Sequence, residues 1–350
     1  MYYNWWHYFI PKICAFLSLT FNPIFIYLLK TDKSLKLGKY KTLLVCFSFF
    51  NMSCSLYDNI VPMASDAHRY AFIVWITEGI FFQHTPTGQL LLSMRCGFIS
   101  VTYAILHAHF VYRYLLMFKE YLLVKYFSPY GLILTMVYCF SHMACWAIIC
   151  ELCFYGDFER KEYVREFFQE VYHDYSHDYN MVIALYWEAS TEAVTRSWIG
   201  VSIVSSTSTA SMSLYFILGY KIMKKLKQHN WVASKTTKKM QKQLFKALTV
   251  QTFIPIVVSL MPCLAIWFGP VLLLDISWVY MSAIVAVSIF PCLDPVAITC
   301  FLPALRGRFT SRIAKFLSIF RRKVPKNSQE SANSMTGMTV LAVNQHSNIY

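Results

Sequence analysis

Seven long apolar stretches constrain this sequence more than any other feature. Each is about 20 residues long or longer, which is the length that a helix needs to cross the hydrocarbon core of a bilayer. Only 14% of the residues are charged, against about 25% in a typical soluble domain. The sequence therefore predicts an all-α integral membrane protein, a bundle of seven transmembrane helices. The predicted spans are residues 8–29, 40–63, 89–118, 129–153, 196–220, 244–268 and 278–302.

The basic residues give the expected orientation. They gather between spans one and two, three and four, and five and six, and after span seven, whereas the loop 154–195 is rich in acids. Segments rich in lysine and arginine stay in the cytoplasm. We therefore expect residues 1–7 outside the cell and the C-terminus inside. The basic residues behind the net charge of +14 then lie next to anionic inner-leaflet lipids. Because this placement accounts for the charge, we expect no nucleic-acid partner.

Three segments outside the spans also carry predictions. Residues 303–325 have apolar side chains at helical spacing, which predicts a short amphipathic helix on the inner membrane surface. Residues 326–350 are rich in Ser, Asn and Thr, which predicts a disordered cytoplasmic tail. The run 71–82 is apolar but short, and Glu78 interrupts it. We expect this run in an outer loop that lies against the bundle or the membrane interface.

An arginine between two tyrosines ends the third span, in the sequence HFVYRYLLMF. Arg113 lies about 24 residues after Gln89, which at about 1.5 Å per residue places it at the cytoplasmic edge of the bilayer. One interpretation is an interfacial arginine that extends towards water between the aromatic anchors Tyr112 and Tyr114.

Four stretches of the sequence resemble the Str-type family of nematode seven-transmembrane chemoreceptors, which are G-protein-coupled receptors. They are LGKYKTLLVCFSFFNMSCSLYDNIVP (37–62), HFVYRY (109–114), TTKKMQKQLFKALTVQTFIPIVVSLMP (236–262) and FPCLDPVAI (290–298). Their order and spacing extend the resemblance over most of the chain between residues 20 and 310. The sequence departs from the family after Pro295, where FLPALRGRF contains Arg306 without the tyrosine that usually precedes this arginine. This departure affects what the resemblance implies about switching in span seven and leaves the resemblance itself unchanged.

The resemblance implies a second interpretation of Arg113. The arginine, with Tyr112 and Tyr114 beside it, would meet a heterotrimeric G-protein when the bundle opens. A guanidinium suits this role because it offers five donors and a permanent charge. The cytoplasmic extension of span six, KKMQKQLFKAL, has Met240, Leu244 and Leu248 on one face with lysines around it. Its lysines Lys239 and Lys242 would lie at the docking surface, or alternatively on a solvated helix end.

Two further features gain a role from the resemblance. Asp294 and Pro295 in span seven would form a switch element, since a buried carboxylate needs a partner and a proline permits a kink. The alternative is a static kink. Pro255 and Pro262 would give span six the bend that lets its inner end move.

A second arginine, Arg95, lies 18 residues before Arg113 and so shares its helical face, about 27 Å nearer the outside. One interpretation pairs it with Asp58 or Glu151, which have a comparable depth. The other makes it the counter-ion of an acidic or hydrogen-bond-accepting ligand. Depth alone suggests that Phe98, Thr102, Met143 and Trp146 also line a ligand cavity in the outer half.

The cysteines near the outer ends of spans three and four allow one disulfide, because that compartment is oxidising. Cys96 would pair with Cys150 or with Cys153, and the sequence leaves both pairings open. The spacing of the cysteines and histidines fits no metal-binding motif, and the sequence has no phosphate loop, nucleophile elbow or catalytic carboxylate pair. We expect no metal, no cofactor and no enzymatic activity.

These features predict a chemosensory G-protein-coupled receptor for a small odorant or soluble cue. The resemblance implies the plasma membrane of a sensory neuron, in its cilium. A ligand-gated cation channel of the seven-helix olfactory type is one alternative, although it requires an inside N-terminus that the lysines oppose. A secondary transporter is another, and it would favour repeated halves, which the sequence lacks. An orphan with a structural or trafficking role is the third.

Overall fold

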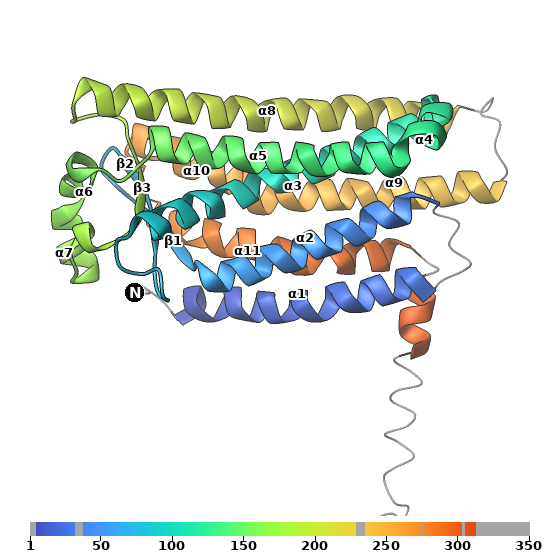
Figure 1. Cartoon of the computed structure of the whole chain (residues 1–350), viewed down its shortest axis with the longest axis horizontal. Coiled ribbons are helices and arrows are strands. Elements are labelled where there is room, and N and C mark those ends of the chain that lie inside the picture. The colour runs from blue at the N-terminus through green and yellow to red at the C-terminus, as the bar shows by residue number, and fades with distance from the viewer. Residues whose placement is uncertain (1–4, 32–37, 229–234, 275, 303–304, 313–350) are drawn as a thin grey trace, which may run out of the picture. The chain divides into compact units, whose positions relative to one another are not determined.

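The computed structural model describes residues 5–31, 38–228, 235–274, 276–302 and 305–312. Within these ranges, seven helical rods run alongside one another (Figure 1), and each predicted span lies on one of them except for residues 61–63, 129–131, 256–260 and 302. The rods are α1 (Trp5–Thr31), α2 (Tyr40–Ile60), α3 (Pro86–Phe118), α5 (Leu132–Cys153), α8 (Thr191–Lys227), the pair α9 (Lys235–Pro255) and α10 (Met261–Phe268), and α11 (Ser277–Phe301).

Five segments in the described part of the chain are long and apolar enough to cross a membrane. They are Trp5–Thr31, Pro86–Phe118, Pro129–Cys153, Thr191–Lys227 and Ser277–Phe301. The remaining rods are more polar, because α2 buries Asn51, Ser55 and Asp58 and α9 begins with a lysine-rich turn. Buried polar groups of this kind need partners inside the bundle.

The third helix is the centre of the bundle. It packs against α5 and α8, while α1 packs against α2 and α11, and α9 packs against α11. A Cβ atom at Gly97 would lie 2.8 Å from the carbonyl oxygen of Met143 in α5. Glycine at this position therefore lets α3 and α5 approach closely.

Two short turns of π-helix interrupt the long rods. Residues Phe127–Gly131 link α4 (Glu120–Tyr126) to α5, and residues Ile256–Leu260 link α9 to α10. Pro255 ends α9, and Pro262 is the second residue of α10. The two prolines thus flank a turn in which the regular hydrogen-bond ladder is broken, a common position for a bend.

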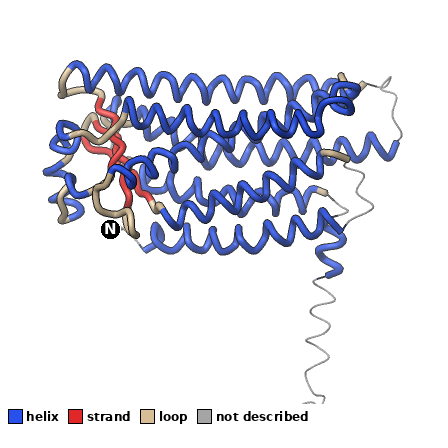
Figure 2. The backbone as a smooth tube through the Cα atoms, viewed as in Figure 1, coloured by secondary structure: helices blue, strands red, loops and turns tan. Residues whose placement is uncertain are grey.

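A small antiparallel sheet covers the end of the bundle at which α3 begins and α5 ends (Figure 2). Its strands, in spatial order, are β1 (Met63–His68), β2 (Ala71–Ile76) and β3 (Met181–Leu185). The helices α6 (Phe158–Tyr163) and α7 (Arg165–Tyr172) pack on the face of the sheet away from the bundle. We call β1, β2, β3, α6 and α7 the cap.

The central strand explains the apolar run AFIVWI. Its alternate side chains Phe72, Val74 and Ile76 belong to the core of the bundle, whereas Ala71, Ile73 and Trp75 pack against α6 and α7. A strand buried on both faces needs apolar residues at every position. The expectation of an all-helical fold was therefore wrong, because residues 71–76 form a strand. The expectation that this run lies against the bundle is confirmed, since Phe72, Val74 and Ile76 pack in the bundle core.

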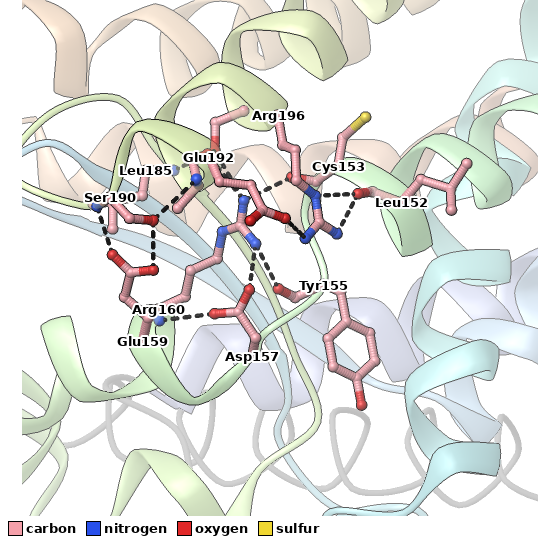
Figure 3. Close-up of polar contacts among 12 residues, drawn as sticks. Leu152, Cys153, Tyr155, Asp157, Glu159, Arg160, Leu185, Ser190, Glu192 and Arg196 are labelled. Carbon is pink, nitrogen blue, oxygen red and sulfur yellow. Dashed lines mark hydrogen bonds and ion pairs between the residues drawn. The ribbon is translucent and has the colours of Figure 1, made fainter.

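Two arginines, one from the cap and one from α8, bind the last turn of α5 (Figure 3). Arg160 is fully buried, and its Nη2 donates to the carbonyl oxygen of Cys153 at 3.1 Å while its Nη1 donates to Oδ2 of Asp157 at 2.7 Å. Arg196 in α8 donates from Nε to the carbonyl oxygen of Leu152 at 2.7 Å. Carbonyls in the last turn of a helix have no partner in their own helix, and the two guanidinium groups supply one.

Side-chain amides fasten the third strand to the start of α3. The amide of Gln89 donates to the carbonyl oxygen of Met181 at 2.8 Å and accepts from its N–H at 3.0 Å. Asn180 accepts from the N–H of Thr85 at 3.0 Å and donates to the carbonyl oxygen of Phe81 at 2.8 Å. Segments that lie about a hundred residues apart in the sequence are therefore joined at this end of the bundle.

Residues 305–312 are helical and belong to a second compact unit, Ala304–Tyr350. They are the part of the predicted amphipathic helix 303–325 that the structure describes. The remainder of that helix and the predicted tail 326–350 lie outside the described residues.

Candidate functional site

A cavity of about 50 Å³ lies between the sheet of the cap and the helices beneath it. The rings of Trp146 and Trp267, both on its wall, have centroids 5.9 Å apart. The wall consists of apolar side chains and thiols, which suits a compact uncharged molecule. The lining residues are Met63, Phe72, Val74, Cys96, Ile99, Trp146, Cys150, Phe154, Val182, Val204, Cys263, Ile266, Trp267, Ala283, Ile284 and Val287.

Of the residues that the sequence suggested for ligand binding, Trp146 lines this cavity. Phe98 and Met143 instead line a groove on the flank of the bundle, and Thr102 is buried in α3 without lining either space. Sequence reasoning missed Trp267. Its signal was a large aromatic side chain four residues after Cys263 in span six, and therefore on the same helical face.

The second arginine of α3 forms an internal ion pair. Nη2 of Arg95 lies 2.5 Å from Oδ1 of Asp58, and both side chains are almost fully buried. Ser288 of α11 lines the same small cavity as Asp58, and its hydroxyl donates to the carbonyl oxygen of Ile284 at 3.3 Å. Glu151, the other partner that the sequence allowed, accepts a hydrogen bond of 2.6 Å from Ser93. Arg95 thus joins α3 to α2 beside a small cavity of about 30 Å³.

The structure does not contain the expected disulfide. Cys96, Cys150 and Cys153 are free thiols. The thiols of Cys96 and Cys150 are in contact, and both line the cavity beneath the cap. Buried thiols pack as small apolar groups. A thiol contact between α3 and α5 therefore stands where the sequence suggested a covalent bridge.

The opposite end of the bundle opens into a cavity of about 360 Å³, which we call the mouth. Arg113 lies at its wall and is only 3% exposed. Its Nη1 donates to Oε1 of Gln241 in α9 at 3.4 Å, and its guanidinium carbon lies 4.8 Å from the ring centroid of Tyr40 in α2. The mouth is lined by Gly38, Lys39, Tyr40, Tyr112, Arg113, Leu116, Leu123, Val124, Thr237, Met240, Gln241 and Leu244.

The residues predicted beside Arg113 divide into two groups. Tyr112 lines the mouth and packs against Phe127, with ring centroids 4.8 Å apart. Tyr114 does not line it and stacks on Phe118 instead.

The lysines predicted on α9 are exposed and do not line the mouth. Lys239 and Lys242 flank the residues that do, because successive residues of a helix point about 100° apart. Sequence reasoning missed Gln241. It lies three residues before Leu244 and seven before Leu248, which placed it on the apolar face of this helix.

A buried polar cluster lies between the cavity and the mouth. Oδ1 of Asp294 accepts from Nε2 of Gln251 in α9 at 2.6 Å, and its Oδ2 accepts from Nδ2 of Asn51 in α2 at 3.0 Å. All three side chains are almost fully buried. The carboxylate thus connects three helices, and both of its observed partners are neutral amides.

Proline in α11 extends this cluster to the first helix. Pro295 has no N–H, so the carbonyl of Pro291 has no partner four residues further along its own helix. That oxygen accepts from Nδ2 of Asn22 in α1 at 3.0 Å and from the hydroxyl of Ser18 at 3.4 Å. Pro295 therefore leaves the carbonyl oxygen of Pro291 free to bind α1.

One rod connects all three regions. In α10, Trp267 lines the cavity beneath the cap. In α9, Gln251 bonds Asp294 and Gln241 bonds Arg113. A displacement of α9 and α10 would change the cavity, the polar cluster and the mouth together.

Comparison with known proteins gives a consistent result. The sequence model of the family described as "Serpentine type 7TM GPCR chemoreceptor Srj" matches residues 1–309. The chain is 36% identical to serpentine receptor class J-38 of Caenorhabditis elegans over 312 residues, which cover 88% of this chain and 93% of that receptor.

More distant relatives carry names of the same kind. The chain is 26% identical over 337 residues to serpentine receptor class r-10 of Caenorhabditis briggsae, covering 94% of this chain and 95% of the relative. It is 22% identical over 273 residues to the G-protein coupled receptor str-33 of Caenorhabditis elegans, covering 77% and 79%. The expected resemblance to nematode chemoreceptors is confirmed. The chain belongs to the Srj family of serpentine seven-transmembrane chemoreceptors.

Proposed function

We propose that this receptor binds a small uncharged molecule in the cavity beneath the cap and activates a heterotrimeric G-protein through the mouth. Membership of the family makes it a membrane receptor and not an enzyme-family protein. The cavity walls carry no charged side chain, which favours an apolar odorant over an acidic ligand.

The observation that carries this proposal is the rod of α9 and α10. A ligand that packs against Trp267 acts on the helix whose other end holds Arg113 through Gln241. A ligand shifts such an equilibrium by the difference between its affinities for the two arrangements. Movement of α9 would separate Gln241 from Arg113 and free the guanidinium to bind carbonyl oxygens of the G-protein.

Several finer expectations belong to the same proposal. The bundle crosses the membrane seven times, with α1 starting outside the cell, so that the cap is extracellular and the mouth cytoplasmic. Pro255 and Pro262 permit the bend in the moving rod, and Asp294 with Pro295 is the switch that the movement rearranges. Lys239 and Lys242 meet acidic groups of the G-protein. The segment 303–325 lies on anionic inner-leaflet lipids, and the receptor resides in the ciliary membrane of a chemosensory neuron.

The test is calcium imaging of cells that express the receptor with or without a promiscuous Gα subunit, across a panel of volatile ketones, esters and acids. We expect a response that needs the Gα and that Arg113→Ala removes at equal surface level. Arg165→Ala, at a half-buried arginine of the cap, is the matched control and should respond normally. A response that persists without any Gα would contradict coupling through the mouth and favour a channel.

A further inference from the structure

The groove on the flank of the bundle has a volume of about 420 Å³, several times that of the cavity beneath the cap. It lies between α2, α3 and α5. Phe49 and Phe140 on its walls are 54% and 59% exposed, so it opens to the outside of the bundle. Its residues are Leu43, Cys46, Phe47, Phe49, Phe50, Ser53, Phe98, Val101, Ile105, Thr135, Met136, Cys139, Phe140 and Met143.

The shape and chemistry of this groove fit a hydrocarbon chain. Along α2 it runs from Leu43 to Ser53, a length of about 15 Å at the helical rise. Its two hydroxyls are already satisfied, because Ser53 donates to the carbonyl oxygen of Phe49 at 3.0 Å and Thr135 donates to that of Gly131 at 2.8 Å. An occupant with polar groups along its length would find no partner here.

One end of the groove is basic. Lys39, at the start of α2, lies one helical turn before Leu43 of the groove and itself lines the neighbouring mouth. Its ammonium group donates to the carbonyl oxygen of Val124 at 3.1 Å, which brings it beside Lys125 in α4. Neither lysine takes part in an ion pair among the described residues. Glu120, in the first turn of α4, is exposed.

The floor of the groove reaches the interior of the bundle. Phe47, Val101 and Cys139 belong to one apolar cluster with Phe290 of α11. The rings of Phe47 and Phe290 have centroids 6.1 Å apart, and Phe290 lies one helical turn before Asp294. A chain seated in the groove would therefore press on the layer that supports the polar cluster.

We propose that the groove is a binding site for an anionic phospholipid of the cytoplasmic leaflet. One acyl chain lies along α2 against α3 and α5, and the headgroup lies at Lys39 and Lys125. The assignment of the leaflet rests on the orientation in the proposed function. The site is separate from the cavity beneath the cap, and its occupancy biases the arrangement of α11 through Phe290.

The test uses the full-length receptor in nanodiscs that contain phosphatidylserine with a photoreactive group in one acyl chain. We expect adducts at residues 43–53 of α2 and 135–143 of α5, displaced by unlabelled phosphatidylserine more readily than by phosphatidylcholine. Cys139→Trp and Ser53→Trp fill the groove from opposite walls and should remove these adducts. Cys145→Trp, an exposed cysteine of α5 outside the groove, is the matched control and should keep them.

The headgroup is tested separately. Lys39→Gln with Lys125→Gln should reduce the preference for phosphatidylserine by about thirtyfold, since each lysine near an anionic surface contributes on the order of 1 kcal/mol and about 1.4 kcal/mol is a factor of ten. Lys224→Gln with Lys227→Gln at the end of α8 should leave it unchanged.

Adducts spread evenly over all lipid-facing helices, or displaced by a sterol and not by phosphatidylserine, would overturn the proposal. Photolabelling needs no G-protein, so its result is independent of whether the receptor signals. Ser53 is exposed, so its substitution should not disturb folding. The Ser53 variant therefore still tests the groove if the Cys139 variant fails to fold.

Discussion

Gln251 of α9 and Asp294 of α11 are joined by a hydrogen bond of 2.6 Å deep inside the bundle. This bond is the direct polar link between the rod that we propose to move and the helix beside it. The carboxylate stays paired with Asn51 when the link is removed, so the effect of breaking it can be measured without losing the whole cluster.

We predict that Gln251→Leu raises ligand-free signalling. A hydrogen bond to a charged group contributes about 1.5–3 kcal/mol, so its loss should increase the active fraction by roughly tenfold or more. The measurement is G-protein activation without ligand, divided by receptor number at the surface. Thr249→Val is the control, because that hydroxyl bonds only the carbonyl of Phe245 in its own helix among the described contacts. Basal activity equal to that of the parent would show that the bond between Gln251 and Asp294 does not stabilise the inactive arrangement.

We predict that Arg95→Met greatly lowers the amount of folded receptor. The change leaves Asp58 as a buried charge without a cationic partner, which costs about 3–5 kcal/mol. Adding Asp58→Leu removes that charge and should restore much of the folded receptor. The measurement is fluorescence size-exclusion chromatography of both variants, with thermal melts of the monodisperse fraction. If the single variant were as stable as the parent, the ion pair would not hold α2 to α3.

We predict that Arg160→Gln loosens the cap while the bundle stays folded. The shorter amide cannot reach the carbonyl oxygens of Cys153 and Ala193 together, and these bonds to a charged donor contribute about 1.5–3 kcal/mol each. Hydrogen exchange followed by mass spectrometry should show faster exchange over residues 155–185. Arg165→Gln, which loses only an exposed pair with Glu162, should exchange like the parent. Unchanged exchange in the first variant would contradict the role of Arg160.

We predict that the cap becomes more stable as the pH rises from about 8 towards the ordinary lysine value. Burial lowers the pKa of Lys161 in α6 to about 8, from an ordinary value of 10.5. Between these values the unfolded chain binds more protons than the folded chain, so the free energy of unfolding increases with pH. Below pH 8 both states carry the proton and this lysine adds no pH dependence.

The lysine effect is isolated by comparing the parent with Lys161→Met at pH 7.5 and at pH 9.5. The difference in melting temperature between the two proteins, followed by tryptophan fluorescence, cancels the titration of other groups. We expect the variant to be the more stable protein at the lower pH, and the difference to shrink at the higher pH. A constant difference would show that Lys161 keeps an ordinary pKa.

The long helices could be predicted because an apolar run of about 20 residues has few other solutions. The cap could not, since β3 is separated from β2 by about a hundred residues, and apolarity on both faces of β2 hides the alternation that identifies a strand. A short apolar run is equally compatible with a loop against the bundle, which was the expectation.

Pairings between side chains were only partly accessible. The expected depth in the membrane limited the partner of Arg95 to Asp58 or Glu151. The structure pairs Arg95 with Asp58, whereas Glu151 accepts a hydrogen bond from Ser93. The same limit applied to α9, where Lys239 and Lys242 were favoured for their charge. The side chain that meets Arg113 is the neutral Gln241, which points about 100° away from Lys242 and about 160° away from Lys239 around the helix.

The acceptor that Pro295 leaves free has a consequence for biosynthesis. The helix α1 is synthesised first, whereas Pro291, whose carbonyl oxygen binds α1, is among the last residues of the bundle to be synthesised. Ser18 and Asn22 therefore wait for nearly the whole chain before they meet Pro291. Closure of α1 against α11 therefore comes late in synthesis, and in a chain truncated before α11 the side chains of Ser18 and Asn22 lack this acceptor.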